Sequence, residues 1–194
     1  ISVPFSSPTI LAYYLKKDCI YYDPTNSVIP YEGQEKFLIN LSSSILPDIS
    51  IRPCNSKKKG SYIKLWERYN SKVEIEEYDV KLVKSFEKCK LFICDHLSTT
   101  YLEALTINLP TILFWDSDSC VSLVYKDEVK VYFKNLMDVG ILHDSGKSAA
   151  QKVNDIYPNI DEWWFSPEVQ SARKLFCEKF AKIPNDFIRD LDKV

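Results

Sequence analysis

A run of polar residues between two apolar segments carries the side chains best suited to chemistry. Asp95, His96, Ser98, Thr99 and Thr100 lie within six positions of one another. Hydroxyls and free backbone N–H groups at the start of a helix bind anions, most often phosphate. The same residues also fit a plain helix N-cap, in which a Ser or Thr oxygen accepts a backbone N–H without any ligand. The residues of the turn leave both interpretations open.

Two charged residues outside the turn are further candidates for binding. Glu103 comes one helical turn after the hydroxyls, where its carboxylate could accept hydrogen bonds from a ribose or sugar hydroxyl. It could equally form a capping box with Thr100, three residues earlier. Arg52 ends a short apolar run, so it could pair with a phosphate at the same sheet edge or be an exposed arginine without a ligand.

The elements around the polar turn have a β-α-β pattern. The apolar run 91–94 predicts a buried strand, the spacing in 101–109 an amphipathic helix, and the run 111–115 a second buried strand. Two strands joined by one helix are parallel and have a right-handed crossover. The polar turn is then expected at the carboxyl end of a strand, where open α/β sheets bind their ligands.

Strands and helices alternate along most of the remaining chain. Strands are predicted at 49–53 and 72–76, with a short strand or turn at 141–144. Helices are predicted at 34–46, 61–69, 79–88, 126–139 and 147–155, and a last helix begins after Ser166 and Pro167. This order predicts an α/β fold, with a Rossmann-like parallel sheet and helices on both faces.

The first thirty residues partly repeat this pattern. A helix is predicted at 9–15 and a strand at 19–22, and an offset of 92 residues places Ser6 and Ser7 over the hydroxyl turn. Successive layers of an α/β fold resemble one another without common function, which is the favoured interpretation. The alternative is a second hydroxyl-lined loop at the same sheet edge.

Composition excludes several classes of protein. The chain has 194 residues, 45% of them hydrophobic, and its 25 Lys and Arg against 27 Asp and Glu give a net charge of −2. That balance argues against general nucleic-acid binding. No apolar stretch is long enough to span a membrane and no signal peptide is visible. The start at Ile1, without a methionine, would fit a fragment.

Cysteines and tryptophans have structural explanations. The six cysteines show no C-x-x-C pair and no histidine at metal-ligand spacing, so free thiols in a reducing cytoplasm are expected, and no zinc site or disulfide. Trp163 and Trp164 are expected to pack in the core or between domains, with sugar stacking as the less favoured alternative.

Several separated motifs resemble the leptospiral-type transferase family of O-antigen and surface-carbohydrate biosynthesis. They are the runs 94–100 and 102–105, Asn108 with 110–115, and the segments 132–133, 140–144, 153–154, 163–170, 172–173 and 176–177. The motifs keep their order between about residues 34 and 187, and Arg52 near a strand end also fits. The family is similar to GT-B glycosyltransferases, in which two Rossmann-like domains face each other.

The resemblance implies roles for the candidate residues. The hydroxyls of residues 98–100 would hold the diphosphate of a nucleotide-activated sugar, and Arg52 would add positive charge. Glu103 would bind the ribose or the donor sugar and His96 would assist the leaving phosphate, whereas Asp95 would mainly fix the turn. No cofactor or metal is expected, because fixed N–H groups and a cation can stabilise the departing diphosphate. The pair Asp116 and Asp118 is interpreted as a loop cap.

The resemblance also implies a domain organisation. Residues 1–33 would end a preceding α/β unit or linker, 34–160 would form the donor-binding domain, and 161–194 a helical segment packing back toward an amino-terminal half. The chain would be the carboxyl-terminal half of a GT-B-type fold, and the missing amino-terminal domain would commonly supply the general base.

The resulting hypothesis is the donor-binding part of a transferase. It would move a sugar, or a related group such as a glycerophosphate, from a nucleotide donor to a glycan or lipid-linked acceptor of a surface polysaccharide or O-antigen. It would act in the cytoplasm, with peripheral association at the inner face of the membrane allowed. A sugar-nucleotide epimerase of the same layout and a non-catalytic nucleotide- or sugar-binding domain are the alternatives, and the sequence alone leaves all three open.

Overall fold

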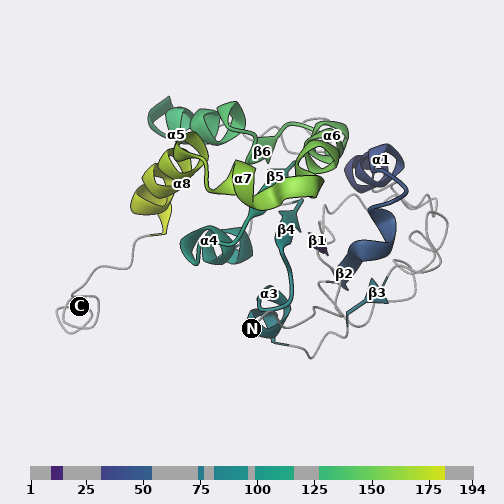
Figure 1. The fold of residues 1–194 in the computed structure, drawn as a ribbon. Coiled ribbons are helices and arrows are strands. Elements are labelled where there is room, and N and C mark those ends of the chain that lie inside the picture. Colours follow the sequence, from purple (N-terminus) through teal and green to yellow (C-terminus); the bar gives the residue numbers. More distant parts are fainter. Residues whose placement is uncertain are drawn as a thin grey trace, which may run out of the picture.

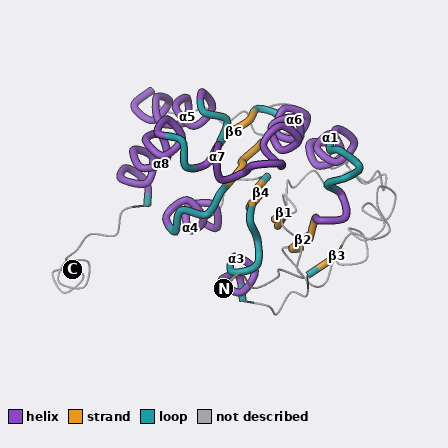
Figure 2. Tube along the Cα trace, viewed as in Figure 1, coloured by secondary structure: helices purple, strands orange, loops and turns teal. Residues whose placement is uncertain are grey.

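A parallel sheet between two layers of helices forms the centre of the molecule (Figures 1 and 2). The computed structural model describes residues 10–14, 32–53, 74–76, 81–95, 99–115 and 127–181. The strands are β1 (Ile10–Tyr14), β2 (Ile49–Pro53), β3 (Glu74–Ile75), β4 (Leu91–Cys94), β5 (Thr111–Phe114) and β6 (Leu142–His143). The helices are α1 (Glu32–Asn40), α3 (Leu82–Phe86), α4 (Thr99–Thr106), α5 (Asp127–Asp138), α6 (Gly146–Ile156), α7 (Ile160–Trp164) and α8 (Pro167–Phe180), with 3-10 turns η1 (Leu46–Asp48) and η3 (Tyr157–Asn159).

The strand order creates a point of reversal inside the sheet. The order is β3-β2-β1-β4-β5-β6, and all five pairings are parallel. The chain adds β2 and β3 on one side of β1, and β4, β5 and β6 on the other. The boundary between β1 and β4 is therefore the topological switch point, where the carboxyl ends of two adjacent strands diverge toward opposite faces.

Alternating side chains of the central strands build two separate cores. Leu91 and Ile93 of β4 point to one face, while Phe92 and Cys94 point to the other, and all four are fully buried. Because both faces are covered, the strand is a continuous apolar run and not an alternating one. The central strands can therefore be recognised from apolar content, but not from periodicity.

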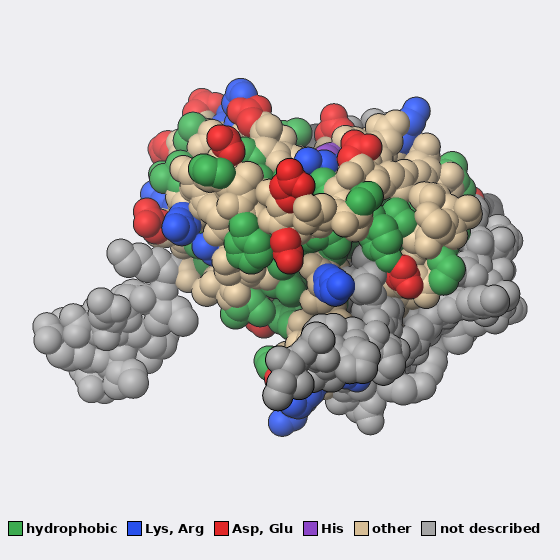
Figure 3. Space-filling view, viewed as in Figure 1, with side chains coloured by type: hydrophobic (Ala, Val, Ile, Leu, Met, Phe, Trp, Pro, Cys, Tyr) green, Lys and Arg blue, Asp and Glu red, His purple; other side chains and the backbone are tan. Residues whose placement is uncertain are grey.

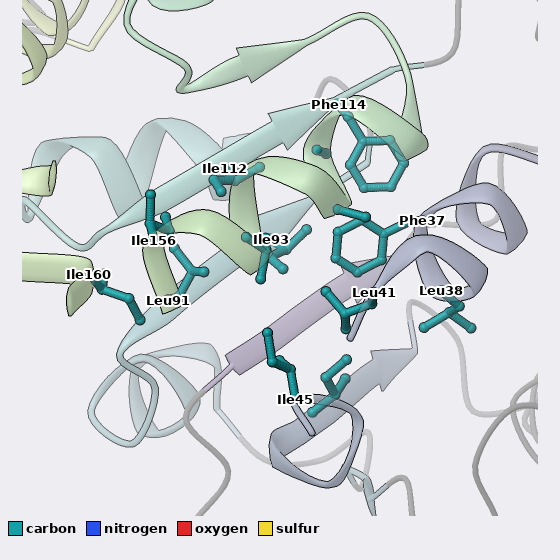
Figure 4. Close-up of a cluster of buried hydrophobic side chains, with 14 of the residues drawn as sticks. Phe37, Leu38, Leu41, Ile45, Leu91, Ile93, Ile112, Phe114, Ile156 and Ile160 are labelled. Carbon is teal, nitrogen blue, oxygen red and sulfur yellow. The ribbon is translucent and has the colours of Figure 1, made fainter. Parts of the chain in front are cut away.

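Helices α1 and α6 cover the first face of the sheet (Figure 4). Phe37 of α1 stacks on Phe114 of β5, with ring centroids 5.4 Å apart and planes 9° from parallel. Ile156 and Ile160 close the same core from the end of α6 and the start of α7. Aromatic stacking of this kind adds to the burial energy and fixes the position of α1 over the sheet.

The two helices of this face are held together at both ends. An added Cβ at Gly146 would lie 1.9 Å from the Gly33 carbonyl oxygen, so the backbones touch at their first turns. Further along, Asn154 accepts the Ser42 N–H at 2.8 Å and donates to the Asn40 carbonyl at 2.9 Å. Helices α1 and α6 therefore run side by side in the same direction, with both amino ends at the carboxyl edge of the sheet.

Helices α4, α5 and α8 cover the second face. Trp164 is fully buried there, and its indole N–H donates to the Asn108 carbonyl at 3.0 Å. Trp163 is partly buried and donates to the Val139 carbonyl at 3.1 Å. Buried tryptophans usually satisfy the indole N–H in this way. The expectation that both tryptophans pack in the core is confirmed.

Most predicted elements lie where the sequence placed them. The strand 49–53 has the predicted bounds, the strand 91–94 is exact, and the strand from residue 111 ends one residue early. Helix α5 ends as expected before Gly140, which has a φ of 73° that glycine adopts without strain. The predicted helix 61–69 and strand 19–22 lie outside the described residues.

The predicted helix at 9–15 is wrong, because residues 10–14 form strand β1. The segment ILAYY is a short apolar run, and such a run is equally compatible with a buried strand or a buried helix. Parallel pairing with β2 on one side and β4 on the other makes this segment a strand. Residues 10–14 thus belong to this sheet and not to a preceding unit, and the 92-residue correspondence, which aligned Ala12 with helical Ala104, fails.

Two smaller predictions also differ from the structure. The helix predicted at 34–46 ends at Asn40, and the chain then reaches β2 through turn η1, although Phe37, Leu38, Leu41 and Ile45 are all buried as expected. The helix predicted at 79–88 is only Leu82–Phe86, and Val83, expected on its buried side, is 62% exposed. In so short a helix the apolar spacing does not determine which side faces the core.

The carboxyl-terminal helices pack on the domain itself. Through Ala181, α7 and α8 contact the second core, where Phe176 lies against Phe133 at 5.3 Å between ring centroids. Packing of residues 161–194 toward an amino-terminal half stays a prediction. No helix among the described residues is long and apolar enough to cross a bilayer. Basic and acidic side chains are interspersed on the face shown in Figure 3.

Candidate functional site

The predicted polar turn begins at the switch point of the sheet. Tyr13 of β1 pairs with Cys94 of β4, so residues 14 and 95 follow at the same level on the carboxyl edge. Asp95 comes directly after β4, and helix α4 begins at Thr99. A parallel sheet binds ligands in the crevice outside such a pair of strand ends. The fold therefore places Asp95 and the amino end of α4 at the position where ligands of this class of fold bind.

The side chains at the start of α4 differ in exposure. Thr99 is exposed, Thr100 is only 7% exposed, and Glu103 is exposed one turn further on. Thr100 is the second residue of the helix, so it does not occupy the N-cap position that a capping box requires. The capping-box interpretation of Glu103 is therefore not the geometry found, and its proposed contact with a ligand hydroxyl stays a prediction.

Some predicted site residues cannot be compared with the structure. His96 and Ser98 lie between Asp95 and Thr99, outside the described residues. Ser6 and Ser7 also lie outside them, but the prediction of a second hydroxyl loop rested on a helix at 9–15. That segment is a strand, and the second hydroxyl loop at Ser6 and Ser7 itself stays a prediction.

A glutamine that the sequence analysis did not single out joins the site. Gln34 in the first turn of α1 donates its Nε2–H to Asp95 Oδ2, across 61 positions of sequence. Gln34 is 5% exposed, and its Oε1 has no hydrogen-bond partner among the described residues. A sequence signal existed: positions 34, 37, 38 and 41 share one helix face, and residue 34 alone is polar there.

Arg52 lies at the end of β2, in a pair with an acidic residue. Its Nη1 is 2.6 Å from Glu76 Oε2 and 3.1 Å from Ser85 Oγ, and the hydroxyl of Ser85 donates to Glu76 Oε1. Both charged side chains are 12% exposed. Glu76 compensates the charge of Arg52 inside the fold, so the arginine is not simply exposed. Its predicted contact with phosphate stays a prediction.

His143 ends β6 in a hydrogen-bonded neutral arrangement. Nε2 lies 3.1 Å from the Gly140 carbonyl and Nδ1 2.9 Å from Ser148 Oγ, which fits a ring that donates from Nε2 and accepts at Nδ1. Burial lowers the pKa of His143 below its usual 6.5, and Lys152 lowers it further, while the Gly140 carbonyl and Asp144 act in the opposite direction. The imidazole is therefore kept neutral.

The described cysteines are free thiols. Cys89 and Cys177 are partly buried and Cys94 is buried in β4. Burial raises the pKa of Cys89 to about 12, and burial also raises the pKa of Cys177. Thiols with raised pKa values are poor nucleophiles, so these two cysteines are structural. Within the described ranges, no three His, Cys, Asp or Glu side chains cluster as metal ligands.

The chemistry of the edge follows from its polar groups. The first turns of α1, α4 and α6 present backbone N–H groups and the positive ends of helix dipoles toward the carboxyl edge of the sheet. Asp95 and Gln34 contribute oxygen acceptors next to them. An edge that carries both N–H donors and oxygen acceptors can bind a ligand that combines an anionic group with hydroxyl groups.

The fold and its carboxyl edge define a Rossmann-like α/β protein. The family model described as LIC12162 family transferase matches residues 5–194. The chain therefore belongs to this family of transferases and is an enzyme of that class, as the motif resemblance implied. The match also extends to residue 5, whereas the resemblance began near residue 34.

Comparisons with individual proteins are less close. No curated protein sequence matches the chain. Among solved structures, the chain is similar to the catalytic domain of cholesterol-alpha-glucosyltransferase from Helicobacter pylori, with 13% sequence identity and a TM-score of 0.47. That similarity covers 87% of this chain and 95% of the other.

Proposed function

We propose that the chain is a glycosyltransferase, or the donor-binding part of one, that holds a nucleotide-activated sugar at the carboxyl edge between β1 and β4. The diphosphate lies at the amino end of α4, near Thr99 and Thr100, and Glu103 faces the ribose or the transferred sugar. The observation that carries the proposal is the position of Asp95 and α4 at the switch point of a parallel sheet, in a chain of a transferase family.

The chemistry of glycosyl transfer fits this edge. Cleavage of the bond between sugar and diphosphate builds negative charge on the leaving group in the transition state. Fixed N–H donors and hydroxyls at a helix amino end stabilise that charge without moving. The proposal includes a reaction that needs no metal ion, and Arg52 and His96 stay candidates for additional positive charge and proton transfer to the leaving phosphate.

Acceptor and cellular location extend the same proposal. The motifs resemble transferases of O-antigen and surface-carbohydrate biosynthesis, so the acceptor is a glycan or a lipid-linked glycan. Free thiols Cys89, Cys94 and Cys177 suit a reducing cytoplasm, with the acceptor at the inner face of the membrane. The general base is expected from an amino-terminal domain.

The test is calorimetric titration of the chain with UDP, GDP, CDP and CMP. Saturable binding by one of them is expected, and a Ser98→Ala/Thr99→Ala variant should lose about tenfold or more in affinity, because two hydrogen bonds to a charged phosphate are removed. Thr106→Val is the matched control, since this exposed threonine lies at the other end of α4, where its hydroxyl donates to the Leu102 carbonyl.

Two results would contradict the proposal. One is no binding by any of the four nucleotides to a chain whose unfolding is cooperative. The other is equal affinity in the wild type and the Ser98→Ala/Thr99→Ala variant, which would make the hydroxyls a helix cap only. Release of an epimerised sugar from the donor without an acceptor would favour the epimerase alternative.

A further inference from the structure

Gln34 combines deep burial with a hydrogen-bond acceptor that has no partner. The side chain is 5% exposed, and Nε2 donates to Asp95 Oδ2. Oε1 is buried and accepts no hydrogen bond from any described residue. Buried amide oxygens without a partner are uncommon in native proteins, and they call for a specific explanation.

The orientation of the amide is determined by its neighbour. Turning the amide by 180° would place Oε1 against the Asp95 carboxylate, and two acceptors would then repel each other. The close contact of Gly33 with Gly146 and the stacking of Phe37 on Phe114 hold the first turn of α1 in place. Oε1 is therefore a fixed acceptor beside Asp95.

The location of this acceptor links it to the substrate. Asp95 follows β4 at the switch point, so the hydrogen bond to Asp95 places the Gln34 amide at the same edge of the sheet, on the side covered by α1. The hydroxyls proposed to hold the phosphates are at the start of α4, which covers the opposite face of the sheet. An uncharged acceptor next to a carboxylate suits a neutral hydrogen-bond donor and disfavours phosphate, which the carboxylate repels.

We propose that Gln34 is a substrate-binding residue whose Oε1 accepts a hydrogen bond from a hydroxyl group of the carbohydrate part of the donor. Asp95 is a positioning residue that aims the amide. The hydroxyl belongs either to the ribose or to the transferred sugar, since both carry the same chemistry. This assignment rests on the proposed function, and it adds a specificity determinant on α1 to a site otherwise formed by α4.

The experiment compares ligands that differ by one hydroxyl. The nucleoside diphosphate that binds best among UDP, GDP and CDP is titrated beside its 2′-deoxy counterpart, and the matching nucleotide-glucose beside its 2-, 3-, 4- and 6-deoxyglucose analogues. Wild type, Gln34→Met and Gln34→Asn are measured with each ligand. Gln151→Met, an exposed glutamine on neighbouring α6, is the control for the substitution itself.

The expected result is a loss of affinity that depends on the presence of one hydroxyl group in the ligand. Gln34→Met should weaken binding of the hydroxylated ligand about tenfold, while the ligand without that hydroxyl binds wild type and variant alike. The ligand and deoxy analogue that show this dependence identify whether the hydroxyl bound by Gln34 belongs to the ribose or to the transferred sugar. Gln34→Asn keeps the amide but withdraws it by one methylene, so it provides the same comparison if Gln34→Met does not fold.

Other outcomes overturn the inference in distinguishable ways. Suppose that the wild type binds ligand, but the Gln34 variants lose affinity by the same factor for the hydroxylated and the deoxy ligand of every pair. Gln34 then only supports the fold. In that case the proposed function stands and the inference is wrong. If the folded wild type binds none of the nucleotides, both are wrong.

Discussion

Arg52 illustrates how a single residue acquires a use that its sequence position does not reveal. At the end of a strand it has the right place for phosphate binding, yet Glu76 and Ser85 already surround its guanidinium. Three segments converge on that contact: β2, the residue after β3, and α3. The pair therefore ties the edge of the sheet together, whatever else the arginine binds.

Loss of either partner should destabilise the fold. Arg52→Met or Glu76→Gln alone is expected to lower the free energy of unfolding by about 3 kcal/mol, because a nearly buried charge is left without its partner. The double variant should lose less unfolding free energy than the two single variants lose together, and the difference is a coupling energy of about 1–3 kcal/mol. Urea unfolding of the four proteins measures this cycle.

The same variants test phosphate binding by Arg52. If Arg52 contacts the donor, Arg52→Met/Glu76→Gln should bind the nucleotide more weakly than Glu76→Gln alone. Equal nucleotide affinities would limit Arg52 to its structural pair, and strictly additive stabilities would show that the ion pair contributes nothing.

His143 should make stability depend on pH. Burial lowers its folded pKa below 6.5, so between 6.5 and the folded value the unfolded chain binds a proton that the folded chain does not. The contribution of His143 to the free energy of unfolding is therefore fully present above about pH 7 and decreases as the pH falls below 6.5 toward the folded pKa. The measurement is urea unfolding at pH 7, 6 and 5.

The control for this prediction is His143→Gln. It removes the titrating group and should flatten the part of the pH dependence that His143 contributes. A variant with the same slope as the wild type would mean that His143 does not titrate differently in the folded state. Lys152 lowers the pKa of His143 and Asp144 raises it, so neutral variants of the two should change the pH dependence of stability in opposite directions.

At the scale of elements, the contact of α1 with α6 positions the site. Gly146→Ala would bring a methyl group to 1.9 Å from the Gly33 carbonyl, where backbone and not a flexible side chain must move. We expect a loss of about 3 kcal/mol in unfolding free energy, at the upper end for overpacking. Separation of the helices should also withdraw Gln34 from Asp95 and weaken nucleotide binding.

Gly140→Ala is the matched comparison for Gly146→Ala. Its φ of 73° disfavours alanine by about 1–2 kcal/mol, but the nearest atoms belong to the flexible end of Lys152, at 2.9 Å. It should therefore lower stability without changing nucleotide affinity. Equal effects of both substitutions on affinity would argue against a positioning role for the α1–α6 contact.

At the scale of the whole molecule, ligand binding should stabilise the chain without added metal. A nucleotide at 100 times its dissociation constant adds about 2.7 kcal/mol, which raises the melting temperature of a domain of this size by roughly 5–10 °C. We expect the same increase in EDTA, because the proposed mechanism holds the phosphates with helix N–H groups and hydroxyls and uses no metal ion. An increase that requires Mg²⁺ would contradict the metal-independent mechanism.

By itself, the sequence determined which segments are buried and where the chain turns polar. The apolar runs at 91–94 and 111–114 and the hydroxyls before α4 are local features, so the β-α-β unit and its edge could be predicted. The motif resemblance, which depends only on residues and their order, likewise identified a transferase family that the family match shows.

Only the tertiary structure decided those features that depend on residues far apart in the sequence. Whether ILAYY is strand or helix depended on its pairing with β2 and β4, because a short apolar run has no periodicity to read. The partners of Arg52 and Gln34 come from 24 and 61 positions away, brought there by the sheet order. The physical reason is that hydrogen bonds and packing act between neighbours in space, and the order of parallel strands alone determines which distant residues become neighbours.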